Sequence, residues 1–328
     1  MEKLLSVIIY VCDAEHTLER CVGSVIYQSY RNIEIILIDN GSTDKSANVC
    51  DSLTQLYACI KVEHLKKTSI GNALNSGIEM ASGEYVAFLG SGDNVQSDLY
   101  SCLINTIENY GVTVAEAGFE KTQFFKKYYT NVNKKMEISC SKDALAKNYS
   151  MKGFSTKYWN KVYQANLLKD IRFPSCKGDE SEFFTWKVYA NAQSLATVEA
   201  KMYFRNNRQR DDMTTLSYAV DFVSAYKERL QHDEAFDEEL FQFGQKSYVK
   251  LLYERLKWLV NDKKPWRTKK HPFYIFAEAL SKVDDDVFIT LYPSSRRLKA
   301  IKLLRKSKFL FRVMFTCYTK YYEKIVRK

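Results

Sequence analysis

The sequence has little of what metal centres and disulfide frameworks require. It contains only four histidines, which lie far apart, and its eight cysteines include no Cys-x-x-Cys pair. Scattered cysteines are typical of reduced thiols, whereas a zinc site would need closely spaced ligands. We therefore expect free thiols and no histidine-based metal centre.

Long apolar runs are also missing. No stretch approaches the roughly 18 apolar residues that a membrane-spanning helix needs. The opening segment, MEKLLSVIIYVCDAE, has a short apolar run followed by acidic residues where a secretory cleavage site would have small ones. This pattern favours a buried first strand over a signal peptide. With 328 residues, 46% of them hydrophobic, the chain is expected to fold as a soluble globular protein with a sizeable core.

Two phosphate-binding motifs are absent as well. No Gly-x-Gly-x-x-Gly follows the first apolar run, and no Gly-x-x-x-x-Gly-Lys-Ser/Thr occurs anywhere. Neither a dinucleotide fingerprint nor a P-loop is therefore expected. The chain also shows no internal repeat and no low-complexity segment.

The excess of positive charge is confined to residues 296–328. This segment has twelve Lys or Arg residues and one acidic residue, whereas the rest of the chain has 37 basic and 38 acidic residues. The near-neutral charge of residues 1–295 argues against nucleic-acid binding. Because apolar residues and tyrosines interleave with the cations, the segment is predicted to form an amphipathic helix on an anionic membrane surface. The alternative is a helix packed on the protein's own body with its charges in solvent.

Strand and helix patterns alternate over the first ninety residues. Strands are expected at residues 4–11, 33–38, 60–65 and 84–89, the first two rich in β-branched residues as doubly buried strands are. Between them, apolar residues recur at helical spacing. This βαβαβαβ order predicts a Rossmann-like α/β fold, with a mostly parallel sheet and helices on both faces.

The same pattern places a ligand site. In such sheets, ligands bind beyond the carboxyl ends of the strands, so the loops after residues 11, 38 and 89 are expected to line one site. Later segments mix short strands with helices and then become mostly helical. We expect three parts: an α/β domain over 1–215, a helical extension over 216–295 and the basic tail over 296–328.

Several separated motifs resemble the family 2 glycosyltransferases of GT-A fold. They are SVIIYVCDAEHTLERCVGSVIYQSYRNIEIILIDNGSTDKS, ALNSGIEMASGEYVAFLGSGD, YWNKVY and RFPSCKGDESEFFTWKVY, in that order. The resemblance covers roughly residues 4–215 and is greatest to bacterial enzymes that build surface polysaccharides. It implies a nucleotide-sugar donor and a lipid-linked saccharide acceptor, met at the cytoplasmic face of the cell membrane by a peripherally bound enzyme.

The resemblance also implies a mechanism and a donor site. An aspartate deprotonates the acceptor hydroxyl in an inverting displacement, while a divalent metal, Mn or Mg, stabilises the leaving diphosphate. By this resemblance Asp39 contacts the base or ribose of the nucleotide. The other expected donor-binding residues are Asp13, Asn75, Asp93, Lys161 and Arg205. Each of these residues, taken alone, also fits a purely structural role: Asp39 could cap a helix, and Trp159 could be a core aromatic.

The metal-binding motif departs from the family pattern. Its usual Asp-x-Asp-Asp appears as Gly90, Ser91, Gly92 and Asp93, so Asp93 is the one remaining metal ligand. A hard divalent cation requires several anionic oxygens. One carboxylate together with the diphosphate would hold a metal weakly at best. Leu74 also replaces an arginine that the family places near the diphosphate.

The expected base position has changed too. The usual Glu-Asp-Glu aligns with Glu180, Ser181 and Glu182, so a hydroxyl occupies the position of the base. Asp179, Glu180 and Glu182 are the candidate replacements. Two hypotheses remain open: an active transferase with a relaxed or metal-independent site, and an inactive relative that acts as a scaffold or partner for an active glycosyltransferase.

Overall fold

The computed structural model describes residues 2–122, 135–150, 153–178, 180–206, 215–260, 271–292, 295–308 and 310–316. The chain divides into two compact units. The first, here called the α/β unit, comprises Met1–Cys176 and Glu180–Asp211, and the second, the helical unit, comprises Lys177–Asp179 and Asp212–Lys328. Residues 216–295 and 296–328, which the sequence separates by charge, thus belong to one unit.

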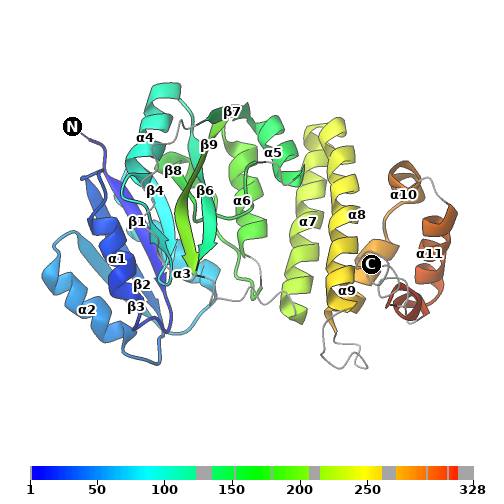
Figure 1. The fold of residues 1–328 in the computed structure, drawn as a ribbon, viewed down its shortest axis with the longest axis horizontal. Helices are drawn as coiled ribbons and strands as arrows, with labels where there is room; N and C mark the ends of the chain where they lie inside the picture. Colours follow the sequence, from blue (N-terminus) through cyan, green and yellow to red (C-terminus); the bar gives the residue numbers. More distant parts are fainter. Residues whose placement is uncertain are drawn as a thin grey trace, which may run out of the picture. The chain divides into compact units, whose positions relative to one another are not determined.

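The α/β unit is built on a mixed sheet that has nine strands among the described residues (Figure 1). In chain order these are β1 (Leu5–Val11), β2 (Ile33–Asn40), β3 (Ile60–Leu65), β4 (Tyr85–Gly90), β5 (Asn94–Val95), β6 (Val114–Thr122), β7 (Met136–Cys140), β8 (Lys161–Gln164) and β9 (Ser194–Asn206). Their spatial order is β3-β2-β1-β4-β8-β6-β9-β5, and β7 pairs with β9. The first four strands are mutually parallel, and β8 runs antiparallel to β4 and β6.

Helices connect these strands. They are α1 (Leu18–Ile26), α2 (Ser46–Leu56), α3 (Ile70–Met80), α4 (Leu99–Tyr110), α5 (Ser141–Ser150) and α6 (Glu180–Asn191), with a 3-10 turn at Ala165–Leu168. The hydroxyl of Ser69 caps α3 by accepting from the backbone N–H of Asn72. Gly77 allows α3 to lie close to the sheet, because a Cβ there would come within 2.4 Å of the Ile8 side chain.

An aromatic cluster joins the sheet to α6. The ring of Phe88, at the centre of β4, contacts four other rings edge-on at centroid distances of 5.4–6.0 Å. These rings belong to Tyr158, Tyr163, Phe173 and Phe184. Phe173 and Phe184 also stack on each other at 3.7 Å. The cluster therefore holds the start of α6 against the carboxyl-terminal half of β4.

The helical unit contains α7 (Leu216–Phe236), α8 (Glu238–Val260), α9 (Pro272–Ser281), α10 (Asp285–Leu291) and α11 (Ser295–Lys306), and residues 310–316 are helical too. Aromatic rings form much of its core: Tyr226 of α7 stacks on Tyr248 of α8 at 5.2 Å, and Phe222 meets Phe276 of α9 at 5.8 Å. Among the described residues, no helix is both long and apolar enough to span a bilayer.

Part of the predicted basic tail packs within the helical unit. Ile301, Leu304 and Phe311 are fully buried, and the guanidinium of Arg312 lies 4.8 Å from the ring of Phe273. Residues 317–328 lie outside the described residues. Some of the tail's apolar side chains therefore contribute to the protein's own core.

The α/β class with a helical C-terminal region is confirmed. The four expected strands form β1 to β4, and they are parallel as the βαβ order predicts. The short strands β5, β7 and β8 and the bulged pairing of β6 with β9 have no comparable pattern in the sequence.

Candidate active site

The carboxyl ends of the parallel strands form one edge of the sheet. The chain passes from β1 to β2 and β3 on one side, then returns to β4 on the other side of β1. The loops after β1 and β4 therefore diverge at this point, which is where ligands enter sheets of this type. Asp13 follows β1, Asp39 is the penultimate residue of β2, and Asp93 follows β4.

Asp39 is a buried carboxylate with a hydrogen-bonding partner on each oxygen. One oxygen accepts from the backbone N–H of Ser42 at 3.1 Å, and the other lies 2.9 Å from Nδ1 of His64. Nε2 of His64 lies 3.1 Å from a carboxylate oxygen of Asp51. Only the protonated imidazole donates from both nitrogens. Accordingly, the hydrogen bond to Asp39 is the main cause that raises the pKa of His64.

Asp13 is joined to Asp39 through the loop after β2. Its backbone N–H donates to the hydroxyl of Ser42, the residue whose own N–H donates to Asp39. The backbone N–H of Thr43 donates to the carboxylate of Asp13 at 2.7 Å and lowers the pKa of that group. Asp13 has a positive φ of 48°, which aspartate tolerates better than most residues. The structure thus brings the two predicted residues together.

Asp93 is held from the other side of the site. The hydroxyl of Tyr203 donates to one carboxylate oxygen at 2.6 Å, and the backbone N–H of Asn206 donates to the other at 2.9 Å. Only 3% of Asp93 is exposed. Burial raises the pKa of Asp93, while the two hydrogen bonds and the charge of Arg205 oppose that rise.

An aromatic and cationic platform adjoins Asp93. The ring of Trp159 lies 4.3 Å from that of Tyr203, and the guanidinium of Arg205 lies 5.6 Å from the Trp159 ring centroid. The plainer interpretation of Trp159 as a core residue agrees with its 8% exposure. Arg205 itself is partly exposed.

Tyr158, which precedes Trp159, lies in the aromatic cluster that joins the sheet to α6. Its pKa is raised first by burial and then by the charge of Glu180, the hydroxyl of Tyr10 and the charge of Asp93, while Arg205 lowers it. Three of the predicted site residues, Asp93, Glu180 and Arg205, thus act electrostatically on one phenol group. Tyr158 was not predicted as a site residue, because its only signal in the sequence is an aromatic-rich stretch.

The first turn of α6 carries the remaining candidates. Glu180, Ser181 and Glu182 follow one another, so their side chains leave the helix about 100° apart. Ser181 is 4% exposed and points into the protein, whereas the two glutamates are partly exposed. Glu180 is the one whose charge acts on Tyr158. Asp179 lies outside the described residues.

Comparison with known proteins identifies the family. The model of "Glycosyl transferase family 2" matches residues 6–172. The chain belongs to this family. It is 28% identical to glycosyltransferase GlyA of Streptococcus pneumoniae over 210 residues, which are 61% of this chain but only 30% of GlyA. It is 27% identical over 251 residues to the GalNAc(5)-diNAcBac-PP-undecaprenol beta-1,3-glucosyltransferase of Campylobacter jejuni, covering 75% of this chain and 78% of that protein.

A solved structure resembles the whole chain. The crystal structure of S. aureus TarS 1-349 in complex with UDP-GlcNAc superposes with a TM-score of 0.72, covering 98% of this chain and 92% of TarS 1-349. The sequence identity is 18%, so the likeness concerns the fold alone. Together with the family match, it establishes the fold as GT-A.

Family 2 glycosyltransferases often use a divalent metal, but the residues present here do not fit one. Both oxygens of Asp93 already accept hydrogen bonds from the protein. Gly90 and Gly92 add no side-chain oxygen. Within the described ranges, no group of three His, Cys, Asp or Glu residues is placed to hold a metal ion. A hard cation needs more oxygen ligands than this edge of the sheet offers.

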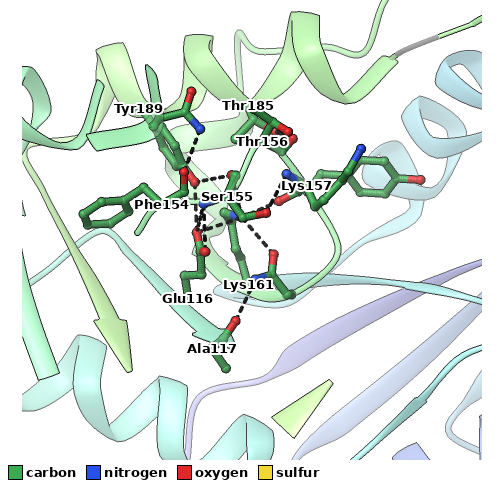
Figure 2. Close-up of polar contacts among 12 residues, drawn as sticks. Glu116, Ala117, Phe154, Ser155, Thr156, Lys157, Lys161, Thr185 and Tyr189 are labelled. Carbon is green, nitrogen blue, oxygen red and sulfur yellow. Dashed lines mark hydrogen bonds and ion pairs between the residues drawn. The ribbon is translucent and has the colours of Figure 1, made fainter. Parts of the chain in front are cut away.

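Lys161 and Asn75 are engaged inside the α/β unit. The ammonium of Lys161 is fully buried, 2.9 Å from a carboxylate oxygen of Glu116 and 3.2 Å from the Ser155 carbonyl (Figure 2). Burial lowers the pKa of Lys161. Asn75 exchanges two hydrogen bonds of 2.9 Å with the backbone of Phe173. This geometry gives both side chains a structural role and does not favour the donor contacts predicted for them.

The buried pair of Lys161 and Glu116 fixes the segment that precedes β8. Figure 2 shows the carboxylate of Glu116 beside the backbone N–H of Ser155, which donates to it at 2.8 Å. The hydroxyl of Tyr189, on α6, lies 3.0 Å from the same carboxylate. Residues 154–160, which carry Tyr158 and Trp159, are therefore tied to both β6 and α6.

Proposed function

We propose that this protein transfers a sugar from a nucleotide-sugar donor to a saccharide acceptor without requiring a bound divalent metal. The observation that carries this proposal is that Asp93 and Arg205 meet at one aromatic platform, formed by Tyr203 and Trp159, at the ligand-binding edge of a glycosyltransferase fold. A carboxylate and a guanidinium at one place are the two groups that a displacement at a sugar phosphate needs.

The roles follow from the chemistry of each group. The nucleoside is assigned to the side of Asp13 and Asp39, where the exposed carboxylate of Asp13 can accept hydrogen bonds from base or ribose. The diphosphate is assigned to Arg205, since guanidinium groups bind phosphate oxygens strongly. Glu180 takes the proton of the acceptor hydroxyl while the oxygen of that hydroxyl bonds to C1 of the donor sugar. The C1–O bond to the diphosphate breaks, and its electron pair leaves with the nucleoside diphosphate.

Two relatives support the substrate classes. TarS was crystallised with UDP-GlcNAc, and the name of the C. jejuni relative specifies an acceptor linked to undecaprenyl diphosphate. For this chain we assign a nucleoside-diphosphate sugar as donor and a lipid-linked saccharide as acceptor. Calorimetric titration of UDP, GDP and dTDP identifies the nucleotide.

A membrane surface is the proposed location. Leu310, Val313 and Met314 lie on one helical face and are 39–52% exposed, and the side chains of Lys302 and Lys306 are exposed nearby in sequence. Apolar side chains flanked by cations suit the boundary of an anionic bilayer. Such a position brings the enzyme to a lipid-linked acceptor at the cytoplasmic face of the membrane.

The base assignment gives the direct test of the activity. Glu180→Gln keeps the size of the side chain but cannot accept a proton, so turnover should fall at least about 100-fold, within the range lost with a general base. Donor affinity should stay within about twofold, because Glu180 is not assigned to the donor. Glu182→Gln, two residues along the same helical turn, is the matched control and should remain active. Equal activity of wild type and Glu180→Gln would refute the assignment.

A second candidate function is a non-catalytic partner of an active glycosyltransferase. The specific observation in its favour is that Gly90, Gly92 and Ser181 replace three carboxylates of the family motifs. Under this proposal the purified protein would bind a nucleoside diphosphate but would neither hydrolyse the corresponding nucleotide-sugar nor transfer from it. Release of nucleoside diphosphate in the presence of a lipid-linked saccharide extract separates the two functions.

A further inference from the structure

Tyr158 is held rigidly by its ring and its backbone. Its ring lies between Phe88, at a centroid distance of 5.7 Å, and Phe173, at 5.0 Å, with both contacts edge to face. The hydroxyl of Tyr163 donates to the backbone carbonyl of Tyr158 at 2.7 Å. On the preceding side, the hydroxyl of Thr185 donates to the carbonyl of Thr156 at 2.8 Å. The position of the phenol group is therefore set before any ligand arrives.

The hydroxyl of Tyr158 differs from those of neighbouring tyrosines. Tyr163, Tyr189 and Tyr203 are buried, and each donates its hydroxyl proton to a carbonyl or carboxylate. The Tyr158 hydroxyl forms no hydrogen bond with any residue that the structure describes, although its ring is packed among other aromatics. Tyr158 is partly exposed, so this donor is accessible to a ligand.

Its surroundings indicate which ligand atom it meets. The guanidinium of Arg205 lies 5.6 Å from the ring of Trp159, the residue that follows Tyr158. The charge of Arg205 lowers the pKa of Tyr158, whereas the carboxylates of Asp93 and Glu180 raise it. An anionic ligand is expected to bind next to Arg205 and away from Glu180, the proposed base. Because burial and both carboxylates raise the pKa of Tyr158, the phenol keeps its proton at neutral pH and acts only as a donor toward an anion.

We propose that the hydroxyl of Tyr158 donates a hydrogen bond to the diphosphate leaving group, beside Arg205. This inference rests on the function proposed above. As the C1–O bond breaks, the electron pair and the new negative charge pass to the diphosphate oxygen. Tyr158 and Arg205 stabilise that charge by hydrogen bonding, and Tyr158 keeps its proton throughout. A preorganised donor of this kind stabilises part of the leaving-group charge that a bound cation would stabilise in a metal-dependent enzyme.

The experiment compares binding of UDP with binding of UMP to wild type and Tyr158→Phe, using the full chain and calorimetry in EDTA. GDP with GMP and dTDP with dTMP are run in parallel. UDP affinity should fall roughly 10-fold or more in the variant, as expected for a lost hydrogen bond to a charged group. UMP affinity should not change, because UMP lacks the second phosphate. The thermal midpoint should stay that of the wild type, since no internal hydrogen bond is removed.

Tyr27→Phe is the matched control. Tyr27 follows α1 and is 72% exposed, so loss of its hydroxyl should leave all affinities unchanged. With an active preparation, Tyr158→Phe should lower kcat more than it changes KM, because the leaving group carries most charge in the transition state.

Three outcomes would overturn the inference. An unchanged ratio of diphosphate to monophosphate affinity in Tyr158→Phe refutes the contact while leaving the proposed function intact. Equal losses for UDP and UMP together with a lower thermal midpoint show a structural role instead. If the wild type binds none of the three diphosphates, the proposed function fails, and this inference fails with it.

Discussion

At the scale of single residues, the site is built from carboxylates that other side chains hold in place. Asp39 lies between Ser42 and His64, and Asp93 lies between Tyr203 and Asn206. Such partners orient a carboxylate and occupy part of its hydrogen-bonding capacity. The same partners determine how the protein responds to pH and to added metal.

The first prediction concerns pH and His64. The folded-state pKa of His64 is raised above its ordinary value of about 6.5, so its protonation stabilises the fold fully below that pH. The contribution is lost as the pH rises through the raised folded pKa. Denaturant unfolding of wild type and His64→Gln should therefore show a stability difference that is largest in acid and shrinks in alkali. His16→Gln, at an 89% exposed side chain, should follow the wild type. A difference that is constant with pH would contradict this.

The second prediction concerns the missing metal ligands. A Cβ at Gly90 would lie 3.1 Å from a carboxylate oxygen of Asp93, so an aspartate there would place two carboxylates side by side. Gly90→Asp/Gly92→Asp should be less stable than wild type in EDTA, because like charges repel. Manganese should then raise its thermal midpoint by several degrees, since binding stabilises the folded state. Gly23→Asp, at a position with no atom within 4 Å of the added Cβ, should show no manganese response. A manganese shift in the wild type would contradict the account.

The sequence was informative about residues whose role depends on local context. Asp39 and Asp93 could be placed at the strand ends, because apolar runs precede each of them. The burial of Lys161 could not be foreseen, because its partner Glu116 lies 45 positions earlier, on another strand. Tyr158 was missed for a similar reason: its importance comes from Asp93, Glu180 and Arg205, which only the fold brings near it.

At the scale of elements, close packing sets where α3 and the segment before α6 lie. Gly71, in the first turn of α3, lies close against the backbone of Pro174. Asn75, one turn further on, forms hydrogen bonds with the backbone of Phe173. Strands β1, β2 and β4 were predictable because each contains an apolar run, and β3 because it lies between two segments of helical periodicity. Strands β5 and β8 were not, because they are only two and four residues long and form by pairing with distant strands.

The third prediction tests this packing. An added methyl group at Gly71 would lie 2.0 Å from the carbonyl oxygen of Pro174, so the backbone must shift. Gly71→Ala should therefore lower the free energy of unfolding by about 1–3 kcal/mol, the usual range for overpacking. The matched control is Gly23→Ala in α1, where nothing lies within 4 Å and alanine favours the helix. Chemical denaturation measures both, and equal stability of the two variants would refute the packing argument.

At the scale of the whole molecule, charge is divided along the chain. A neutral α/β unit carries the candidate site, and the C-terminal end of the helical unit carries the excess of cations. The charge asymmetry could be predicted from composition alone. The burial of Ile301, Leu304 and Phe311 could not, because an amphipathic pattern does not distinguish packing on the protein from packing on a lipid surface.

The fourth prediction concerns the membrane surface. Leu310→Ser/Val313→Ser/Met314→Ser removes exposed apolar area without touching the buried residues of the same segment. The variant should unfold at the wild-type temperature but sediment less with anionic liposomes, and wild-type binding should weaken as salt is raised. Phe236→Ser, at a residue of α7 that is 50% exposed, is the control and should bind like wild type. Undiminished sedimentation of the triple variant would exclude this face as the anchor.

The proposed function requires a donor site that works without a divalent metal. Calorimetric titration of the full chain with UDP, GDP and dTDP, in EDTA and again with manganese, tests this requirement. Because the oxygens of Asp93 are engaged and Gly90 and Gly92 supply none, the account predicts binding of at least one diphosphate in EDTA, with an affinity that manganese changes by no more than about twofold. A tenfold or greater gain in affinity with manganese would contradict it, as would the absence of binding in EDTA.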